Sequence, residues 1–479
     1  MNTICKVKLA VLIASGGLYC QPAMAADEIV ITAERRAQAQ NDVAFSISKI
    51  NHDQLITIQA EHPAEVLNQI PGTSLHRGSG QEHLTAIRSP ILTGGAGAGS
   101  FLFLENGVPV RAAGFANVNG LLEAQTALAD NFEVVRGPGG AFYGANAIHG
   151  VINVQTPTPK QTGYQGTVSV SERIQQANAS LTHVADGKGF YAGIALQNDQ
   201  GFRDDSGADK QQLTLRHVDE TGRWNRDVIF SFTNLNQETA GFLIGEDAFA
   251  DETLATTNPN PNAFRDVRSA RLQSNFSRTS QTGTLTITPY ARWTDMTFRQ
   301  HFLPSQAIER NSHWSVGAQS AWHGKLAGTG TYALGLDAEY TQGFLTEVQE
   351  NPTIFSFIQG VHYDYQVTAS SLSPFANAVF ELGANTSLTI AARGDWTHYD
   401  YETRIAANLP SDPGRFLRPS DRSDTFLPLV PKLACNENLP MAPAGLAMPK
   451  GPAPRKPLIY TGCKTINWSA ISNPKPLIT

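Results

Sequence analysis

The residues best suited to bind a ligand lie in one short stretch, residues 110–119. Arg111 offers a cation, Phe115 an aromatic ring, and Asn117 and Asn119 offer amide groups. Such groups suit an anionic or polyhydroxylated ligand, because a guanidinium pairs with anions and an amide both donates and accepts hydrogen bonds. A surface loop without a ligand is the alternative. The stretch therefore supplies four candidate binding residues.

The sequence offers little that could carry out catalysis. It contains no G-x-S-x-G motif, no H-E-x-x-H motif, and no cysteine–histidine set with the spacing of zinc ligands. His362 and Asp364, in "VHYDY", are expected in a long loop without an evident partner. The glycines near residue 140 lack the spacing of a phosphate-binding loop, and no helix is expected after them. We therefore expect no enzyme, no cofactor and no metal site.

A glycine-rich segment, "NFEVVRGPGGAFYGANAIHGVINVQTPTP", must instead have a structural use. It joins two valine-rich runs that predict strands, Phe132–Val135 and Gly150–Thr156. Glycine reaches backbone conformations that a Cβ forbids. The segment therefore predicts tight turns at Gly137, Gly139, Gly140 and Gly144.

Residues 43–160 as a whole predict a compact α/β unit. Residues 51–72 predict a strand, a turn and a helix, in which Pro63 starts the helix and Pro71 and Gly72 end it. "FLFLENGVPV" predicts a hairpin that turns at Asn106 and Gly107. "LLEAQTALAD" predicts a short helix.

The N-terminus predicts export. Lys6 and Lys8 precede an apolar run, Leu9–Leu18, and "AMA" offers a cleavage site, so residues 1–25 are expected to be a signal peptide. A membrane-spanning helix would need about 20 apolar residues. The 36 basic and 42 acidic residues give no basic surface for nucleic acid.

From about residue 163, polar and apolar residues alternate in one segment after another. In "GTYALGLDAEYTQ", Leu334 and Leu336 share one face with Tyr340, while Asp337 and Glu339 share the other. These runs are long and carry aromatic residues near their ends, which favours a membrane β-barrel over a soluble β-sandwich. Short turns alternate with long loops at 239–267 and 344–368, and about eleven strands are expected up to Tyr401.

The order of these features resembles that of TonB-dependent outer-membrane receptors. The resemblance is carried by "EIVITA" at 28–33 and by the pattern "VRGP…YG…GVINV" between residues 135 and 154. It implies a TonB-box segment at 26–42, a plug domain at 43–160 inside a barrel, and residence in a Gram-negative outer membrane. It also implies three partners, namely TonB, outer-membrane lipid and an external ligand. A ferric siderophore is the expected ligand, with cobalamin or an oligosaccharide as alternatives.

The resemblance also implies roles for residues. The box would add a strand to a sheet of TonB through Glu28, Ile29, Val30, Ile31, Thr32 and Ala33. Arg136 would sit among charges that tie the plug to the barrel wall, with Arg88 and Glu133 as further members. The whole expected plug motif is Arg88, Glu133, Arg136, Gly137, Pro138, Tyr143, Gly144 and Asn153. Loops 89–101 and 110–119 would face outward and hold the ligand.

The C-terminal region does not fit this pattern. Residues 428–479 contain ten of the 27 prolines, and proline removes hydrogen bonds from a strand ladder. Cys435 and Cys463 lie there and could form a disulfide. Back-translation of Gly451–Lys464, shifted by one nucleotide, can encode a segment like a mid-barrel strand of this family, which indicates a frameshift.

The expected fold is therefore a mixed α/β plug domain followed by an incomplete antiparallel transmembrane β-barrel. The barrel would occupy residues 161–430 and hold about eleven of an expected 22 strands. Residues 431–479 would form an irregular, out-of-frame tail. A non-functional fragment of such a receptor is the alternative to a working one.

Overall fold

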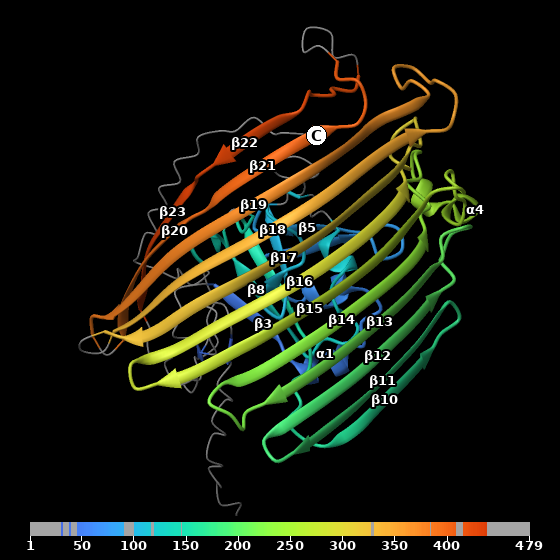
Figure 1. The fold of residues 1–479 in the computed structure, drawn as a ribbon. Coiled ribbons are helices and arrows are strands. Elements are labelled where there is room, and N and C mark those ends of the chain that lie inside the picture. The colour runs from blue at the N-terminus through green and yellow to red at the C-terminus, as the bar shows by residue number, and fades with distance from the viewer. Residues whose placement is uncertain are drawn as a thin grey trace, which may run out of the picture.

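The computed structural model describes residues 30–31, 38–39, 46–90, 100–115, 119–144, 146–326, 330–383, 385–408 and 415–437. It contains a small mixed α/β domain, residues 46–160, and a large curved antiparallel sheet, residues 163–437. Figure 1 shows the small domain on the concave side of the large sheet. We call the domain the plug and the sheet the wall. The arrangement confirms the expected α/β plug and incomplete antiparallel barrel.

The plug is built on a five-stranded sheet with the order β3-β8-β9-β6-β7. Its strands are β3 (Ile47–Ile50), β6 (Phe101–Glu105), β7 (Val108–Pro109), β8 (Asn131–Arg136) and β9 (Gly150–Gln155). β6 and β9 are parallel, and the other pairs are antiparallel. Alternate residues of β8 and β9 belong to two separate apolar clusters. Both faces of the sheet are therefore covered, which explains why the two predicted strands read as nearly continuous apolar runs.

The prediction of a strand within residues 51–58 was wrong, because these residues form helix α1 (His52–Ile58). The Asn51 side chain accepts a hydrogen bond from the Gln54 amide at 3.0 Å, and the Gln54 side chain accepts one from the Asn51 amide at 2.9 Å. This capping box satisfies two amides that a helix start leaves open. Helix α2 (Pro63–Leu67) begins at Pro63, as predicted.

The predicted hairpin is confirmed, since β6 and β7 pair across Asn106 and Gly107, which have φ angles of 48° and 83°. The predicted helix at 121–130 is reduced to one 3-10 turn, η2 (Gly120–Leu122). It stops there because the Gln125 amide donates to the Glu105 carboxylate at 2.9 Å. One helical turn, α3 (Gly140–Tyr143), lies in the glycine-rich segment, where none was expected. A separate hairpin pairs β4 (Thr73–Arg77) with β5 (His83–Ile87).

The wall consists of fourteen antiparallel strand segments. They are β10 (Gly163–Val170), β11 (Ile174–Ala185), β12 (Lys188–Asp199), β13 (Ala208–Asp219), β14 (Asn225–Glu238), β15 (Phe264–Ser280), β16 (Gly283–Arg299), β17 (Ile308–Lys325), β18 (Thr331–Gln349), β19 (Gly360–Glu381), β20 (Thr386–Gly394), β21 (Trp396–Thr403), β22 (Arg422–Phe426) and β23 (Leu429–Glu437). Within the part of the chain that the structure describes, β10 pairs with β11 alone and β23 with β20 alone. The wall is therefore an open arc there.

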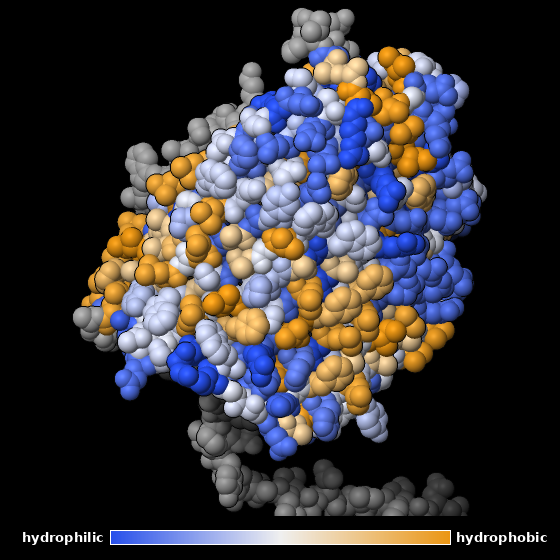
Figure 2. Space-filling model, in the orientation of Figure 1, coloured by the Kyte–Doolittle hydropathy of each residue, from blue (hydrophilic) through white to orange (hydrophobic). Residues whose placement is uncertain are grey.

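The alternation of the wall strands is confirmed. On β18, Leu334, Leu336 and Tyr340 are exposed, while Asp337 and Glu339 are partly buried on the concave face. Figure 2 shows apolar residues gathered in patches over the outer face of the strands. An apolar outer face with polar residues inside is the pattern of a sheet that contacts lipid.

The last four wall segments form two interrupted strands. β20 and β21 both pair with β19, and Asp395 separates them. β22 pairs with β21 and β23 with β20, so a second break lies opposite the first. The Asp395 amide donates to the Pro428 carbonyl at 3.0 Å between the two breaks. Counted as one strand, β20 and β21 complete the eleven strands expected up to Tyr401.

Strand β23 corrects the predicted end of the barrel region at residue 430. Leu429–Glu437 forms a strand where an irregular tail was expected from residue 431. Pro431 fits because β23 pairs with β20 alone among the described strands, and an edge position does not need every N–H. Cys435 lies on β23, whereas Cys463 and the rest of 438–479 lie outside the described residues. The disulfide and the frameshift remain predictions.

Connections differ at the two ends of the wall. β15 and β16 join through residues 281–282, whereas β14 and β15 join through residues 239–263, which include η3 (Ala248–Ala250) and α4 (Glu252–Ala255). The second predicted loop, 344–368, is shorter than expected, because β18 and β19 extend and leave only residues 350–359 between them. The wall therefore has a short-turn end and a long-loop end. No helix in the described residues is long and apolar enough to cross a membrane.

Candidate functional site

Four buried charged side chains join the plug to the wall, and we call them the charged cluster: Glu105, Arg111, Glu123 and Arg271. Glu105 ends β6, Arg111 and Glu123 lie on either side of residues 112–122, and Arg271 lies on β15. Arg271 Nη1 lies 3.3 Å from Glu105 Oε2, and its Nη2 lies 3.1 Å from Glu123 Oε2. Arg271 Nη1 also donates to the Glu123 carbonyl at 2.7 Å. One wall side chain thus holds two plug carboxylates and one plug carbonyl.

Glu123 is the most deeply buried member, with no exposed surface. Burial acts to raise the pKa of Glu123, but the guanidinium groups of Arg111 and Arg271 outweigh burial and lower that pKa to about 2. Arg111 Nε donates to Glu123 Oε1 at 2.6 Å, and Thr294 Oγ1 on β16 donates to Oε2 at 2.7 Å. Glu123 is therefore ionised in the fold and bound by groups from both the plug and the wall.

Further contacts join the plug and the wall closer to the long-loop end. Glu82 Oε1 accepts from Arg265 Nε at 2.7 Å, and the Gln81 amide donates to Gln237 Oε1 at 2.9 Å. Between these contacts and the charged cluster lies an apolar group of Leu122, Leu235, Val267, Met296 and Phe298. The plug is thus attached to β14, β15 and β16 by a layer of apolar contacts between two polar layers.

A second attachment uses helix α3 against β20 and β23. Phe142 packs with Ala141 and Ala391, and the Phe142 carbonyl accepts from Arg393 Nη1 at 3.4 Å. Gly144 has a φ of +88°, and a Cβ there would lie 3.2 Å from the Asp395 carboxylate. A Cβ on Gly140 would lie 3.1 Å from Val430. The tight turn expected at Gly144 therefore lies against the wall, whereas Gly140 lies against it as the first residue of α3 and not in a tight turn.

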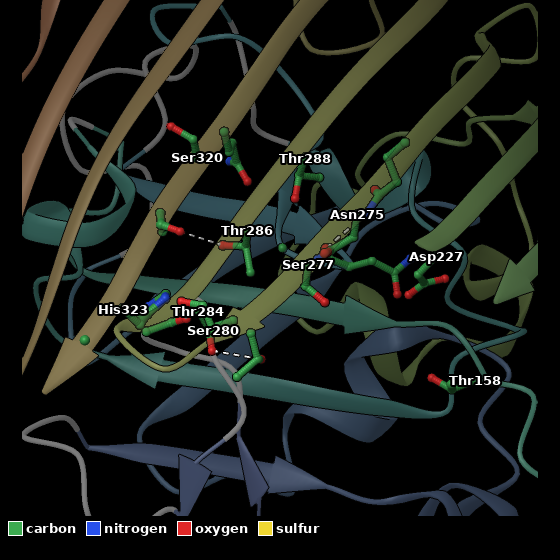
Figure 3. A pocket seen from close by; sticks show the side chains of 18 of the residues that line it. Thr158, Asp227, Asn275, Ser277, Ser280, Thr284, Thr286, Thr288, Ser320 and His323 are labelled. Atoms are coloured by element: carbon green, nitrogen blue, oxygen red, sulfur yellow. Dashed lines mark hydrogen bonds between the residues drawn. The ribbon is translucent and has the colours of Figure 1, made fainter. Parts of the chain in front are cut away.

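A polar cavity of about 1150 Å³ lies between the plug and the short-turn ends of β14–β18. Its plug side includes Asn106, Gln155 and Thr158. Figure 3 shows hydroxyl and amide side chains, among them Ser277 and Thr288, extending from neighbouring wall strands around this space. The cavity and the charged cluster are neighbours along β15. Gln273 lines the cavity, and Arg271 of the cluster is the next inward-facing residue towards the long-loop end.

Arg136, Arg88 and Glu133 lie on a different side of the plug from the charged cluster. Arg136 Nη1 donates to the Pro71 carbonyl at 2.7 Å, and Arg88 Nη2 donates to Ser46 Oγ at 3.1 Å. Burial and the neighbouring Arg88 lower the pKa of Arg136. Glu133 lies 3.9 Å from Lys49 Nζ. The contacts given for these three residues join parts of the plug to one another. The residues that attach the plug to the wall, such as Glu105 and Arg271, were not among those that the sequence pattern named.

The remaining described residues of the expected plug motif lie in turns, at the end of α3 or in the cavity lining. Gly137 has a φ of +118° with open space around it, and Pro138 is exposed beside it. Tyr143 ends α3 and lines the polar cavity. Asn153 Oδ1 accepts from the Gly107 amide at 3.0 Å, which fixes the turn of the β6–β7 hairpin.

The three described candidate ligand residues, Arg111, Phe115 and Asn119, make separate contacts. Arg111 is part of the charged cluster and only 9% exposed, so its position suits attachment better than ligand binding. The Phe115 ring lies 5.9 Å from the His313 ring on β17. Asn119 Oδ1 accepts from the His83 amide at 2.8 Å, and Asn117 lies outside the described residues. Loop residues 91–99 also lie outside them.

The expected TonB box is described only in part. Val30 and Ile31 form strand β1 (Val30–Ile31), which pairs antiparallel with β2 (Gln38–Ala39). Glu28, Ile29, Thr32 and Ala33 lie outside the described residues, as does the expected signal peptide at 1–25.

His362 and Asp364 correct a further expectation, since both lie on β19 rather than in a loop. His362 Nδ1 lies 2.7 Å from Glu347 Oε1, and its ring stacks on Phe416 at 3.8 Å. Asp364 lies 3.8 Å from Arg404. Across the described residues, no group of three or more histidine, cysteine, aspartate or glutamate side chains could hold a metal ion.

Residues 39–151 match the family model of the TonB-dependent receptor plug domain. The chain is 31% identical over 196 residues to the vitamin B12 transporter BtuB of Vibrio vulnificus strain CMCP6, an alignment that covers 40% of this chain and 30% of that protein. It is 29% identical over 153 residues to the protein of the same name from strain YJ016, covering 32% and 24%. The matched region thus spans less than a third of the length of these relatives.

Solved structures resemble the whole described fold. The ferric citrate transporter FecA, in the unliganded form, has a TM-score of 0.67 at 17% identity over 84% of this chain and 61% of that one. The ferric-catecholate import receptor Fiu from E. coli K12 has a TM-score of 0.66 at 12% identity over 84% and 69%. At such identities the likeness concerns the fold.

The matched plug domain and the curved antiparallel wall are the two parts of the fold that this chain shares with TonB-dependent receptors. Residues 39–151 are a TonB-dependent receptor plug domain, and the described chain has the fold of TonB-dependent receptors, as the sequence pattern predicted.

Proposed function

We propose that this protein is an outer-membrane receptor that imports a scarce external ligand with energy supplied through TonB. The observation that carries the proposal is the plug seated on the concave face of the wall through the charged cluster. Polar and ionic contacts hold a plug in one position, and they can re-form with water when the plug moves. The apolar outer face of the wall fits insertion in a membrane.

The box residues 28–33 would bind TonB by strand addition. Val30 and Ile31 are extended in β1 and pair with β2 along one edge, and the other edge of such a strand can extend a sheet of a partner. Ile29 precedes them in the expected box. The outer membrane holds no nucleotide supply, so a mechanical link to the inner membrane is the source of energy that this mode of import needs.

A ferric siderophore is the proposed ligand, with cobalamin or an oligosaccharide as alternatives. Two structural neighbours are by name transporters of ferric compounds, and two curated relatives are by name vitamin B12 transporters. Phe115 and Asn119 remain proposed ligand contacts in the loops at 110–119, together with Asn117. A fragment that does not transport is the other alternative.

The test is uptake by cells that express this chain and lack their own receptors. Iron-55 siderophores, cobalt-57 cyanocobalamin and labelled maltodextrins would be supplied in parallel, and outer-membrane fractions would be probed for the chain. We expect Ile29→Pro to abolish uptake and leave ligand binding intact, because proline removes a backbone donor. Ile29→Val, which keeps the donor, is the matched control.

Unimpaired uptake by Ile29→Pro would reject the box assignment. Absence of the wild-type chain from the outer membrane, together with absence of all uptake, would favour the fragment.

A further inference from the structure

The polar cavity is stacked directly beneath the charged cluster. Along β14, inward-facing Ile229 lines the cavity and Ser231, the next inward residue, donates to Glu105 Oε1 at 2.5 Å. Along β15, Gln273 lines the cavity and Arg271 belongs to the cluster. The charged cluster therefore lies one inward-facing residue beyond the cavity lining, on the side of the long loops.

The lining of the cavity is polar but almost uncharged in sum. It includes eight threonines, three serines and six asparagine or glutamine side chains. Two carboxylates, Asp130 and Asp227, are balanced by two cations, Arg216 and Lys325. Asp227 is held by Arg216 at 2.7 Å, so this pair is already neutralised. Such a surface offers many hydrogen bonds without a strong preference for the sign of charge.

The geometry of the lining also limits affinity. Hydroxyls are spread over four wall strands, β15 to β18, and face plug groups such as Thr156 across the space, rather than converging on one point. Many weak hydrogen-bonding positions allow a solute to enter and leave, which is what passage requires. A single high-affinity pocket would need convergent, desolvated partners.

We propose that this cavity is a low-affinity site for neutral solutes rich in hydroxyl or amide groups, through which an imported ligand passes after the charged cluster separates. The inference rests on the proposed import function and narrows its substrate class. It favours a neutral, amide- or hydroxyl-rich chelate or an oligosaccharide over a polycarboxylate.

The site can be tested on the purified full chain in detergent, without TonB and without transport. Thr288→Cys places a thiol in the cavity, and Thr286→Cys does so at a second position. Thr214→Cys is the matched control, because Thr214 faces inward on β13 but is fully buried against Gln125. Labelling by anionic and cationic methanethiosulfonates is followed by mass spectrometry of the peptide that carries each residue. Raffinose, a neutral trisaccharide, and citrate, a small polycarboxylate, are added at equal ionic strength as competitors.

We expect the thiols at 288 and 286 to react with both reagents at rates within about threefold, because the lining charges balance. Raffinose should slow this reaction at least about twofold more than citrate does, since it can use many weak hydrogen bonds. The thiol at 214 should stay protected.

Four results would overturn the inference. Equal or stronger protection by citrate, or a rate difference above about tenfold between the two reagents, would exclude a neutral site. Absence of protection by raffinose would exclude binding. Rapid labelling at 214 would mean that the plug leaves the wall in solution and that no such cavity exists. Because no result depends on TonB, failure here would leave the uptake test untouched, and failed uptake would leave this site standing.

Discussion

Replacement of Arg271 by methionine should loosen the plug more than any other single change in the wall. Methionine keeps much of the apolar stem but removes the cation. Arg271 is 4% exposed and contacts Glu105 Oε2, Glu123 Oε2 and the Glu123 carbonyl. Its loss leaves two buried carboxylates with fewer partners, a change that costs about 3–5 kcal/mol in buried ion pairs.

The cost can be measured by hydrogen exchange at the amides of residues 119–130, a plug segment that contacts the wall. A loss of 3–5 kcal/mol corresponds to exchange roughly 10²- to 10⁴-fold faster if exchange follows plug release. Arg268→Met is the matched control, because Arg268 is exposed on the same strand and donates to Asn234 Oδ1, also on the wall, at 3.4 Å. It should change exchange by less than about fivefold, as expected for a surface site.

A double-mutant cycle with Glu105→Gln would show whether the ion pair is responsible. The two changes should be coupled by at least about 1 kcal/mol, because each removes the partner of the other. Equal effects of Arg271→Met and Arg268→Met, or strict additivity with Glu105→Gln, would refute the account of the charged cluster.

Three further changes test the plug itself. Burial lowers the pKa of His83 to about 4, so below pH 6.5 the neutral ring of the folded state gains a proton on unfolding. The contribution of His83 to the free energy of unfolding should be complete above pH 6.5 and should fall by roughly 3 kcal/mol as the pH drops to about 4. Urea titrations at several pH values should show a smaller change of this free energy with pH for His83→Gln. Gly144→Val should lower the melting temperature of the chain, because the φ is +88° and the Asp395 carboxylate lies 3.2 Å from the new Cβ, whereas Gly163→Val, with nothing within 4 Å, should not. Asn51→Ala should cost about 1 kcal/mol through the lost cap of α1, and unchanged exchange of the α1 amides would contradict this.

Local chemistry accounts for the elements that could be predicted from the sequence. The Asn106–Gly107 turn needs positive φ angles, and glycine and asparagine accept them, so the hairpin is specified by two adjacent residues. The alternation on β18 records which face meets the plug, because a strand places successive side chains on opposite faces. Helix α1 was missed although its signal was present: Asn51 and Gln54 have the spacing of a capping box.

The charged cluster could not be predicted in the same way. Arg271 and Glu105 are 166 residues apart in the chain and meet only after the wall has curved around the plug. Neither residue stands in a recognisable motif, and the sequence around each does not distinguish it from an exposed charged residue of a strand. Arg136, by contrast, stands in a recognisable motif but makes a contact within the plug, since its guanidinium donates to the Pro71 carbonyl.

The cavity beneath the charged cluster brings water close to the buried ion pairs from the side of the short turns. When the plug shifts by the width of one side chain, water can enter from the cavity and solvate Glu105 and Arg271 before they have fully separated. Hydration at that stage lowers the barrier to separation, because the main cost of breaking a buried pair is to leave charges without solvent. The rate of plug release should therefore depend on water activity. Osmolytes that are excluded from protein surfaces, such as sucrose, should slow it by opposing the hydration of the opening interface.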